Sequence, residues 1–158
     1  MVKSVNAADG DEGKFERELW ALLFEHFQAE RRRWSDTCNQ FGLTLPQAHL
    51  LRMLTVGKPV KMNGLAEALD CDASNITGLV DKLEVRGLIK RQADTEDRRV
   101  KMIAITRAGI NFRLKLWAQL SQPSPSVTSL RLSDKKNLYR IVKRMVATAA
   151  DGRAREVR

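Results

Sequence analysis

Several features on which proteins build catalytic or metal sites are scarce in this chain of 158 residues. Its two cysteines, Cys38 and Cys71, lie far apart and form no CxxC pair, so neither a disulfide scaffold nor a zinc finger is indicated. Its two histidines lack the HExxH spacing of a zinc hydrolase, and no glycine-rich phosphate loop or Ser/His/Asp set is present. We therefore expect no enzyme, no metal site and no cofactor.

Long apolar runs are also missing. No stretch of about 18 apolar residues occurs, and the N-terminus has no charged start followed by an apolar segment, so we expect neither a membrane-spanning helix nor a secretory signal. The absence of a disulfide pattern adds the expectation of a reducing, cytoplasmic location. A hydrophobic content of 43% is enough to fill a folded core.

Positive charge dominates the chain, with a net charge of +9 at pH 7. An excess of this size favours a polyanionic partner, nucleic acid first. However, residues 62–106 contain seven lysines and arginines against eight aspartates and glutamates, a net charge of −1. The excess lies instead in residues 31–33, the last long helix and the tail, so the total charge does not locate a DNA-binding surface.

Helical periodicity is the main structural signal. Apolar residues recur at helical spacing in residues 14–39, after a capping signal at residues 44–47, and again in the last long helix. Gly87 stands where a helix is expected to end. The two ends of the chain, 1–13 and 151–158, are polar and lack this period, so we expect them to be disordered.

The most informative segment runs from Gly64 to Thr106. A short helix, a tight turn, a longer helix, a glycine stop and a charged β-hairpin follow one another there. This order predicts a winged helix-turn-helix, which places one helix in a DNA major groove and a hairpin beside it. In the longer helix, the apolar residues of 76–83 fall at i, i+3, i+4 and i+7 and predict one buried face.

Short polar groups on the other face of that helix predict contacts with base edges and phosphates. Lysines and arginines along the hairpin arms predict phosphate contacts. At the hairpin tip, an aspartate two residues before an arginine can hold the guanidinium in one rotamer that suits the minor groove. The candidate DNA-binding residues are Ser74, Asn75, Thr77, Gly78, Lys82, Lys90, Arg91, Asp97, Arg98, Arg99 and Lys101. Taken singly, each also fits a solvated polar position, and the pairing of helix with hairpin favours DNA.

This segment resembles the MarR family of bacterial transcriptional regulators. The likeness rests on LDCDASNIT at 69–77, LVDKLE at 79–84, RGLIKR at 86–91 and a hairpin tip with Asp97-x-Arg99. It implies a mainly α fold with a small β-hairpin wing, in which dimerisation helices flank the winged helix-turn-helix domain. By that match, Arg99 enters the minor groove and Asp97 orients it.

The resemblance also implies a domain layout and a function. Residues 14–42 are expected to form an N-terminal dimerisation helix, 44–106 the DNA-binding domain and 107–150 the C-terminal dimerisation helices. The implied function is that of a homodimeric repressor, bound to a pseudo-palindromic operator in double-stranded DNA and relieved by a small aromatic ligand. Dimerisation also fits the apolar stripes of the terminal helices, because a lone winged helix does not bury two extra long helices.

An apolar effector pocket is expected between the dimerisation helices and the winged domain. The candidates to line it are Trp20, Trp34, His49, Met53 and Trp117, each of which also fits a packed core position. Neither Cys38 nor Cys71 lies near the start of the first helix, where oxidant-sensing relatives carry their cysteine. Plain buried or half-buried thiols are therefore expected, and oxidant sensing stays an open alternative.

A second function from a different class also fits the predicted fold. A winged-helix module can bind another protein through its hairpin and lack sequence-specific DNA binding altogether. Salt dependence distinguishes the two, because binding through several phosphates weakens steeply as salt rises.

Overall fold

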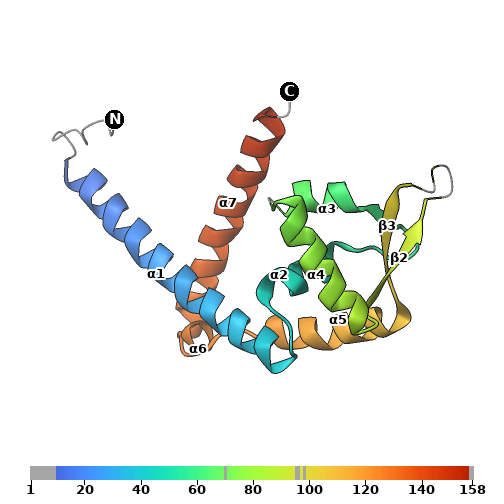
Figure 1. Ribbon diagram of the computed structural model, residues 1–158. Helices are drawn as coiled ribbons and strands as arrows, with labels where there is room; N and C mark the ends of the chain where they lie inside the picture. The colour runs from blue at the N-terminus through green and yellow to red at the C-terminus, as the bar shows by residue number, and fades with distance from the viewer. Residues whose placement is uncertain (1–9, 70, 95–96, 98, 157–158) are drawn as a thin grey trace. The chain divides into compact units, whose positions relative to one another are not determined.

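The computed structural model describes residues 10–156, except residues 70, 95, 96 and 98, and it describes no side chain for Ala73 or beyond Ala149. The chain divides into two compact units, with the boundary between Ser121 and Gln122. Helices make up most of both units (Figure 1), which confirms the predicted mainly α fold with a small antiparallel sheet.

Helices and short strands alternate along the first unit. They are α1 (Asp11–Gln40), α2 (Leu45–Met53), β1 (Val60–Lys61), α3 (Met62–Ala68), α4 (Ala73–Val85), β2 (Ile89–Ala93), β3 (Lys101–Ile105) and α5 (Arg107–Leu120). The second unit contains the single turn α6 (Pro125–Thr128) and the long helix α7 (Leu132–Glu156). Thr44 and Gln47 form the predicted capping box at the start of α2.

The three strands form an antiparallel sheet in the order β1-β3-β2. β2 and β3 are the arms of the predicted hairpin, paired from Ile89 opposite Ile105 to Ala93 opposite Lys101. The sequence does not predict β1, because two residues directly after a proline are too few to show the alternation of a strand. Since β3 lies in the middle, β2 is an edge strand of this sheet.

Both long helices extend further than the sequence predicts. α1 starts at Asp11 and α7 runs to Glu156, so the disorder expected for 1–13 and 151–158 is wrong for the residues inside these helices. Two acidic residues in the first turn of α1 favour the earlier start, because they oppose the positive end of the helix dipole. At the other end, adding residues to an existing helix costs little. Apart from Gly10, what remains of the two ends lies outside the described residues.

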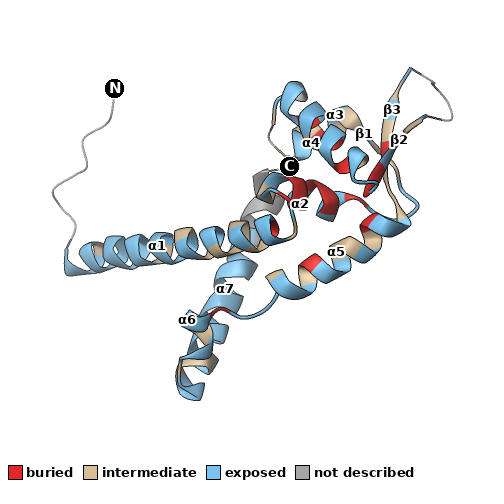
Figure 2. Cartoon of the chain, turned by 60° about the horizontal axis from the view of Figure 1, so that its bottom comes forward, coloured by how far each residue is buried: buried red, intermediate tan, exposed pale blue. Residues whose placement is uncertain are grey.

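The hydrophobic core of the first unit lies between α2, α3, α4, α5 and the sheet (Figure 2). Burial of each large aliphatic side chain contributes about 1.5–3 kcal/mol relative to its exposed state. α1 adds one buried residue near its C-terminal end. The core consists of Cys38, Leu43, Ala48, Leu50, Leu51, Leu54, Leu65, Ile76, Val80, Leu83, Leu88, Ile89, Ile103 and Leu116.

A close contact holds the start of α5 against the hairpin base. Thr106 accepts a hydrogen bond from the Gly109 amide at 3.0 Å and donates its hydroxyl proton to the Gly87 carbonyl oxygen at 2.7 Å. A Cβ added to Gly109 would stand 1.9 Å from the Leu88 carbonyl oxygen. Only glycine fits this position, and it allows the start of α5 to pack directly against Leu88, the residue before β2.

Apolar side chains cover much of the surface of α1 and α7. On α1 the large ones that are 46–68% exposed are Phe15, Leu19, Trp20, Leu22, Phe24 and Phe27. On α7 those that are 38–67% exposed are Leu132, Leu138, Tyr139, Ile141, Val142, Met145 and Val146. Figure 2 shows α1 exposed over most of its length. Among the helices of the described residues, none combines the length and apolar character needed to cross a bilayer.

Cys38 is fully buried, and burial raises the pKa of its thiol. A higher pKa leaves less thiolate, the reactive form, at any given pH. We predict that a thiol reagent at about pH 8 modifies the half-buried Cys71 at least about tenfold faster than Cys38 in the folded protein. Timed labelling followed by peptide mass spectrometry measures both rates, with a Cys38→Ala variant as the control. Equal rates would contradict the burial of Cys38.

The same shift predicts a pH dependence of stability. The folded chain keeps the Cys38 proton at pH values where the unfolded chain releases it. The contribution of Cys38 is therefore complete below the unfolded pKa of about 8.5 and declines as the pH rises through the raised pKa. Denaturant unfolding across this range should show a smaller decline for Cys38→Ala than for the natural chain.

Candidate nucleic-acid interface

α4 is held on the first unit by one apolar edge. Ile76, Val80 and Leu83 have no exposed surface, and their spacing places them on one side of the helix. Turning α4 about its axis would expose all three, at a cost of about 1.5–3 kcal/mol for each. The opposite side of α4 is therefore kept towards solvent.

The C-terminal end of α4 is anchored by Arg86. Its guanidinium donates to the Gly42 carbonyl oxygen at 2.5 Å and to the Phe41 carbonyl oxygen at 3.0 Å, and it lies 5.1 Å from the centre of the Phe112 ring. Phe112 in turn packs edge-on against Phe41, with ring centres 5.8 Å apart. No sequence signal points to this role, since the hydrogen-bond acceptors are backbone atoms 44 and 45 residues earlier.

The exposed side of α4 carries the predicted base and phosphate contacts. Ser74, Asn75, Thr77, Gly78 and Lys82 are all exposed. A Cβ added to Gly78 would meet nothing within 4 Å, so packing inside the protein does not require glycine there. The structure brings these five residues together on one helix, and their contacts with DNA stay predictions.

The wing lies beside α4 (Figure 1), and its cations differ in whether they pair with carboxylates. Lys90 and Lys101 are exposed. Arg91 is half-buried, and its guanidinium donates to Asp81 at 2.5 Å and to Glu84. The hydrogen bond to Asp81 is the largest cause that raises the pKa of Arg91, followed among the raising causes by Glu84.

Asp81 and Glu84 acquire a role that the sequence does not assign to them. They are three residues apart on α4, which places both on one side of the helix. Their partner Arg91 follows in the next strand, after the turn at Gly87. No repeating pattern relates residues of a helix to residues of the strand that follows it, so the sequence gives no signal for this pairing.

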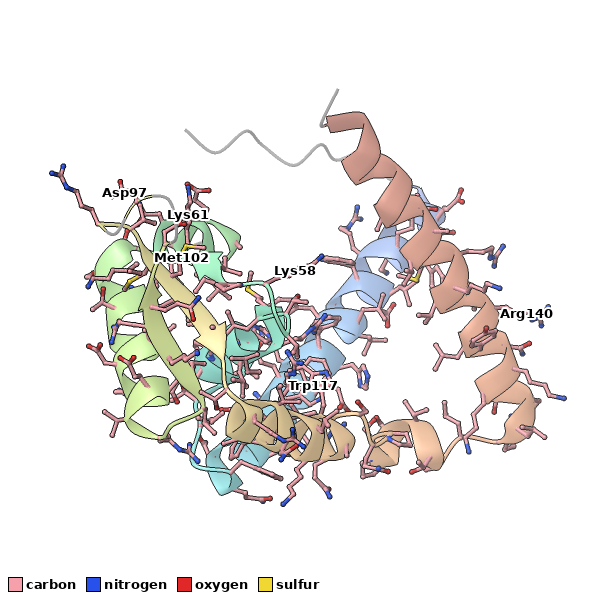
Figure 3. The ribbon with its side chains drawn as sticks, turned by 90° about the vertical axis from the view of Figure 1, so that its right-hand side faces the viewer. Lys58, Lys61, Asp97, Met102, Trp117 and Arg140 are labelled. Atoms are coloured by element: carbon pink, nitrogen blue, oxygen red, sulfur yellow. The ribbon has the colours of Figure 1, made fainter. Side chains whose placement is uncertain are left out.

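Among the described residues of the wing tip, Asp97 and Arg99 do not form the predicted contact between carboxylate and guanidinium. Asp97 Oδ1 accepts a hydrogen bond from the Arg99 backbone N–H at 2.9 Å, whereas the expectation was a bond to the guanidinium. Asp97 therefore shapes the backbone turn that leads to Arg99, as short carboxylates commonly do, and does not hold its rotamer. Both residues are exposed, and Figure 3 shows Asp97 at the end of the hairpin, beyond Met102. Arg98 lies outside the described residues.

Apart from Arg91, four cations of this surface form no ion pair within the described part of the chain. Those on α4 and the wing that make none there are Lys82, Lys90, Arg99 and Lys101. The net charge of −1 for residues 62–106 does not reveal these cations, because it counts all charges alike. Arg91 pairs with carboxylates of α4, whereas the other four cations do not. Available cations of this kind neutralise phosphates in protein–DNA complexes.

All five residues predicted to line an effector pocket lie on three helices that contact one another, but Trp20 lies far along α1 from the others. Trp34 is on α1, His49 and Met53 are on α2, and Trp117 is on α5, and each pair of these helices is in contact. Trp20 lies on α1 at a distance of about 21 Å along the helix axis from Trp34. Within one chain, Trp20 is therefore separate from the other four.

The two tryptophans of this group differ in their surroundings. The guanidinium of Arg52 lies over the ring of Trp117, which Figure 3 labels, at 5.6 Å from its centre. The indole N–H of Trp34 is buried and has no hydrogen-bond partner among the described residues. A buried donor without a partner costs about 1–3 kcal/mol, which an acceptor brought by a ligand can recover.

A model of the MarR family matches residues 43–101, from the loop after α1 to the first residue of β3. Among curated proteins, the uncharacterized HTH-type transcriptional regulator YfiV of Bacillus subtilis strain 168 is 31% identical over 91 residues. The aligned region covers 58% of this chain and 57% of YfiV, so the chain spans little more than half the length of that relative.

Solved structures share the fold over most of the chain. The YusO protein from Bacillus subtilis has a TM-score of 0.72 at 21% identity, over 88% of this chain and 99% of its own. CouR from Rhodococcus jostii RHA1, bound to p-coumaroyl-CoA, has a TM-score of 0.60 at 28% identity, over 80% of this chain and 89% of its own. The matched residues contain α4 and the start of the wing, and over this part the chain is similar to the MarR family, whose curated relatives are transcriptional regulators.

Proposed function

We propose that this chain is a cytoplasmic, homodimeric repressor that binds a pseudo-palindromic operator and is released from it by a small aromatic ligand. The observation that carries the DNA-binding part is the exposed side of α4. Ser74, Asn75 and Thr77 are exposed there, opposite the buried apolar edge and beside the cations of the wing.

In this proposal α4 lies in the major groove and the wing lies over the neighbouring minor groove. The short side chains of α4 reach base edges, while Lys82, Lys90 and Lys101 bind phosphates. Arg99 enters the minor groove, where the negative potential is strongest. Asp97 supports it through the backbone, because its carboxylate holds the turn at the Arg99 amide.

The exposed apolar faces of α1 and α7 support homodimerisation. Contiguous apolar patches of this kind are rare on monomeric soluble proteins and mark contact surfaces. A second copy of the same chain offers matching faces, and a two-fold axis would place the two α4 helices about 34 Å apart, one turn of DNA. A pseudo-palindromic operator then matches the symmetry of the dimer.

The unpaired N–H of Trp34, with Trp117 on a helix that contacts α1, supports an aromatic ligand. A ligand with a ring and an acceptor oxygen can stack on tryptophan and satisfy that donor. CouR, which shares the fold, is bound to p-coumaroyl-CoA, whose acyl group carries a phenol ring. A ligand at the junction of α1, α2 and α5 would favour dimers in which the α4 helices no longer match the operator, and so shift the population away from DNA.

The DNA-binding proposal predicts the effect of Arg99→Ala. An operator is first obtained by selecting bound duplexes from a random-sequence pool, in which we expect an inverted repeat to be enriched. In a mobility-shift titration, Arg99→Ala should bind this operator more weakly by about 1–3 kcal/mol, because a minor-groove contact is lost.

Lys14→Ala on α1 is the charge-matched control and should bind the operator like the natural chain. Unchanged affinity of Arg99→Ala would refute the assignment of the wing tip. A pool without an enriched repeat would refute sequence-specific DNA binding, and it would favour the alternative of a protein-interaction module.

The dimer proposal predicts that Ile141→Glu separates the two chains. Ile141 is 46% exposed on α7, and burying an unpaired carboxylate at an apolar interface costs several kcal/mol, so the dimer dissociation constant should rise about a hundredfold or more. Sedimentation at several concentrations measures it. Arg140→Glu is the control, because Arg140, labelled in Figure 3, precedes Ile141 and is turned about 100° from it around the helix. If the Ile141→Glu variant remains dimeric, α7 is not part of the dimer interface at Ile141.

The ligand proposal predicts opposite effects of Trp34→Phe on binding and stability. Removing a buried donor that has no partner should leave the unfolding midpoint of the unliganded protein unchanged or higher. Binding of 4-hydroxybenzoate, a small phenolic carboxylate, should weaken about tenfold by calorimetry. If ligand binding is the same in both proteins, Trp34 does not contact the ligand.

A further inference from the structure

Three hydrogen bonds from Arg91 converge on two carboxylates of α4. Its Nη2 donates to Asp81 Oδ1 at 2.5 Å, its Nη1 donates to Glu84 Oε2, and its backbone N–H donates to Glu84 Oε1 at 2.8 Å. We call these three residues the Arg91 clamp. α4 thus holds both the side chain and the main chain of a single residue of the wing.

The backbone hydrogen bond of the Arg91 clamp lies at an open edge. β2 pairs with β3 on one side, and its other side has no neighbouring strand in the described sheet. Glu84 accepts the Arg91 N–H at this edge, which an edge strand otherwise offers to water or to another chain. The position of β2 along α4 is therefore fixed by the main chain, independently of the rotamer of Arg91.

The guanidinium has little capacity left for a phosphate. The Arg91 side chain is 26% exposed, and both of its terminal nitrogens are bound to carboxylates. Lys90, the residue before it, points to the other face of β2 and is exposed. For Arg91 to bind a phosphate, it would have to break charge-assisted hydrogen bonds, which are about twice as strong as neutral ones.

The clamp also changes the charge of the surface next to α4. The side chains of Asp81 and Glu84 are 54% and 34% exposed, respectively. Without Arg91 the two carboxylates would repel each other and any phosphate nearby. Arg91, on the wing, neutralises part of this negative charge. The negative charge next to α4 is therefore reduced only when the wing is docked on the helix.

We infer that Arg91 is a positioning residue that sets the angle between the wing and α4, so that both engage their grooves at the same time, and that it does not touch DNA itself. The inference rests on the proposed DNA binding for its effect on affinity. It replaces the direct phosphate contact that the sequence suggests for this arginine.

One variant gives opposite results for these two roles. If Arg91 binds a phosphate, Glu84 competes with DNA for the guanidinium, and Glu84→Ala should strengthen binding by freeing Arg91 and removing a negative charge. If Arg91 positions the wing, Glu84→Ala should weaken binding, because β2 loses its hold on α4. Alanine is well tolerated inside a helix, so α4 itself should remain intact.

The experiment measures fluorescence anisotropy with the selected operator at salt concentrations from about 50 to 200 mM. We expect Glu84→Ala and Arg91→Met each to weaken operator binding about tenfold, with an unchanged slope of log affinity against log salt. Arg91→Lys keeps the charge but not the two-pronged geometry, and it should bind almost as poorly as Arg91→Met. Glu67→Ala on α3 removes an exposed carboxylate outside the clamp and should not weaken binding.

Two results would overturn the inference. One is Glu84→Ala binding the operator as tightly as the natural chain or more tightly. The other is a slope that falls by about 0.9 in Arg91→Met, which is the signature of one lost phosphate contact.

A measurement without DNA separates failure of this inference from failure of the proposed function. The Arg91 amide should exchange its hydrogen slowly in the natural chain and in Glu67→Ala, and about tenfold or more faster in Glu84→Ala. Fast exchange in the natural chain would refute the clamp even if the operator is bound. Slow exchange with no operator found would retain the clamp and refute the DNA-binding proposal.

Discussion

The orientation of α4 depends on the burial of Ile76, Val80 and Leu83, and the rest of the surface follows from it. A helix held by an apolar edge presents a fixed opposite side, whatever residues stand there. Arg86 then fixes the end of the helix and Arg91 fixes the wing beside it. The buried edge of α4, Arg86 and Arg91 thus position the exposed side chains of α4 and the wing, and these positioning groups need not contact a binding partner themselves.

Some arginines of this fold hold elements together and others are exposed to a partner, and a count of net charge does not distinguish the two. Arg86 and Arg113 donate to backbone carbonyls of the preceding helices and loops, and Arg91 donates to carboxylates. These guanidiniums hold elements together, because a planar group with several donors can satisfy acceptors from two segments at once. Counting them with the exposed cations of the wing overstates the charge that faces a partner and hides where it lies.

Elements with a repeating pattern could be predicted from the sequence, and elements without one could not. The buried edge of α4 shows helical spacing over Ile76–Leu83, and the capping box of α2 is a local signal. β1 has two residues and no period, so it emerges only from its pairing with β3. The Asp97 hydrogen bond was misjudged for a related reason, since a carboxylate near an arginine can bind either its amide or its guanidinium, and the turn geometry decides. The partners of Arg86 and Arg91 depend on tertiary packing, which no local pattern records.

The contact between Gly109 and the Leu88 carbonyl oxygen affects where this protein can be divided. A boundary drawn after Thr106, where the wing ends, would separate the hydroxyl group of that residue from the amide that it caps. It would also remove Arg113, which closes the C-terminal end of α2 through the carbonyls of Leu51 and Leu54. The unit that can be exchanged between relatives therefore includes the first two turns of α5. In a chimera joined inside that stretch, the residues on the two sides of this packing contact would come from different proteins and would not be complementary.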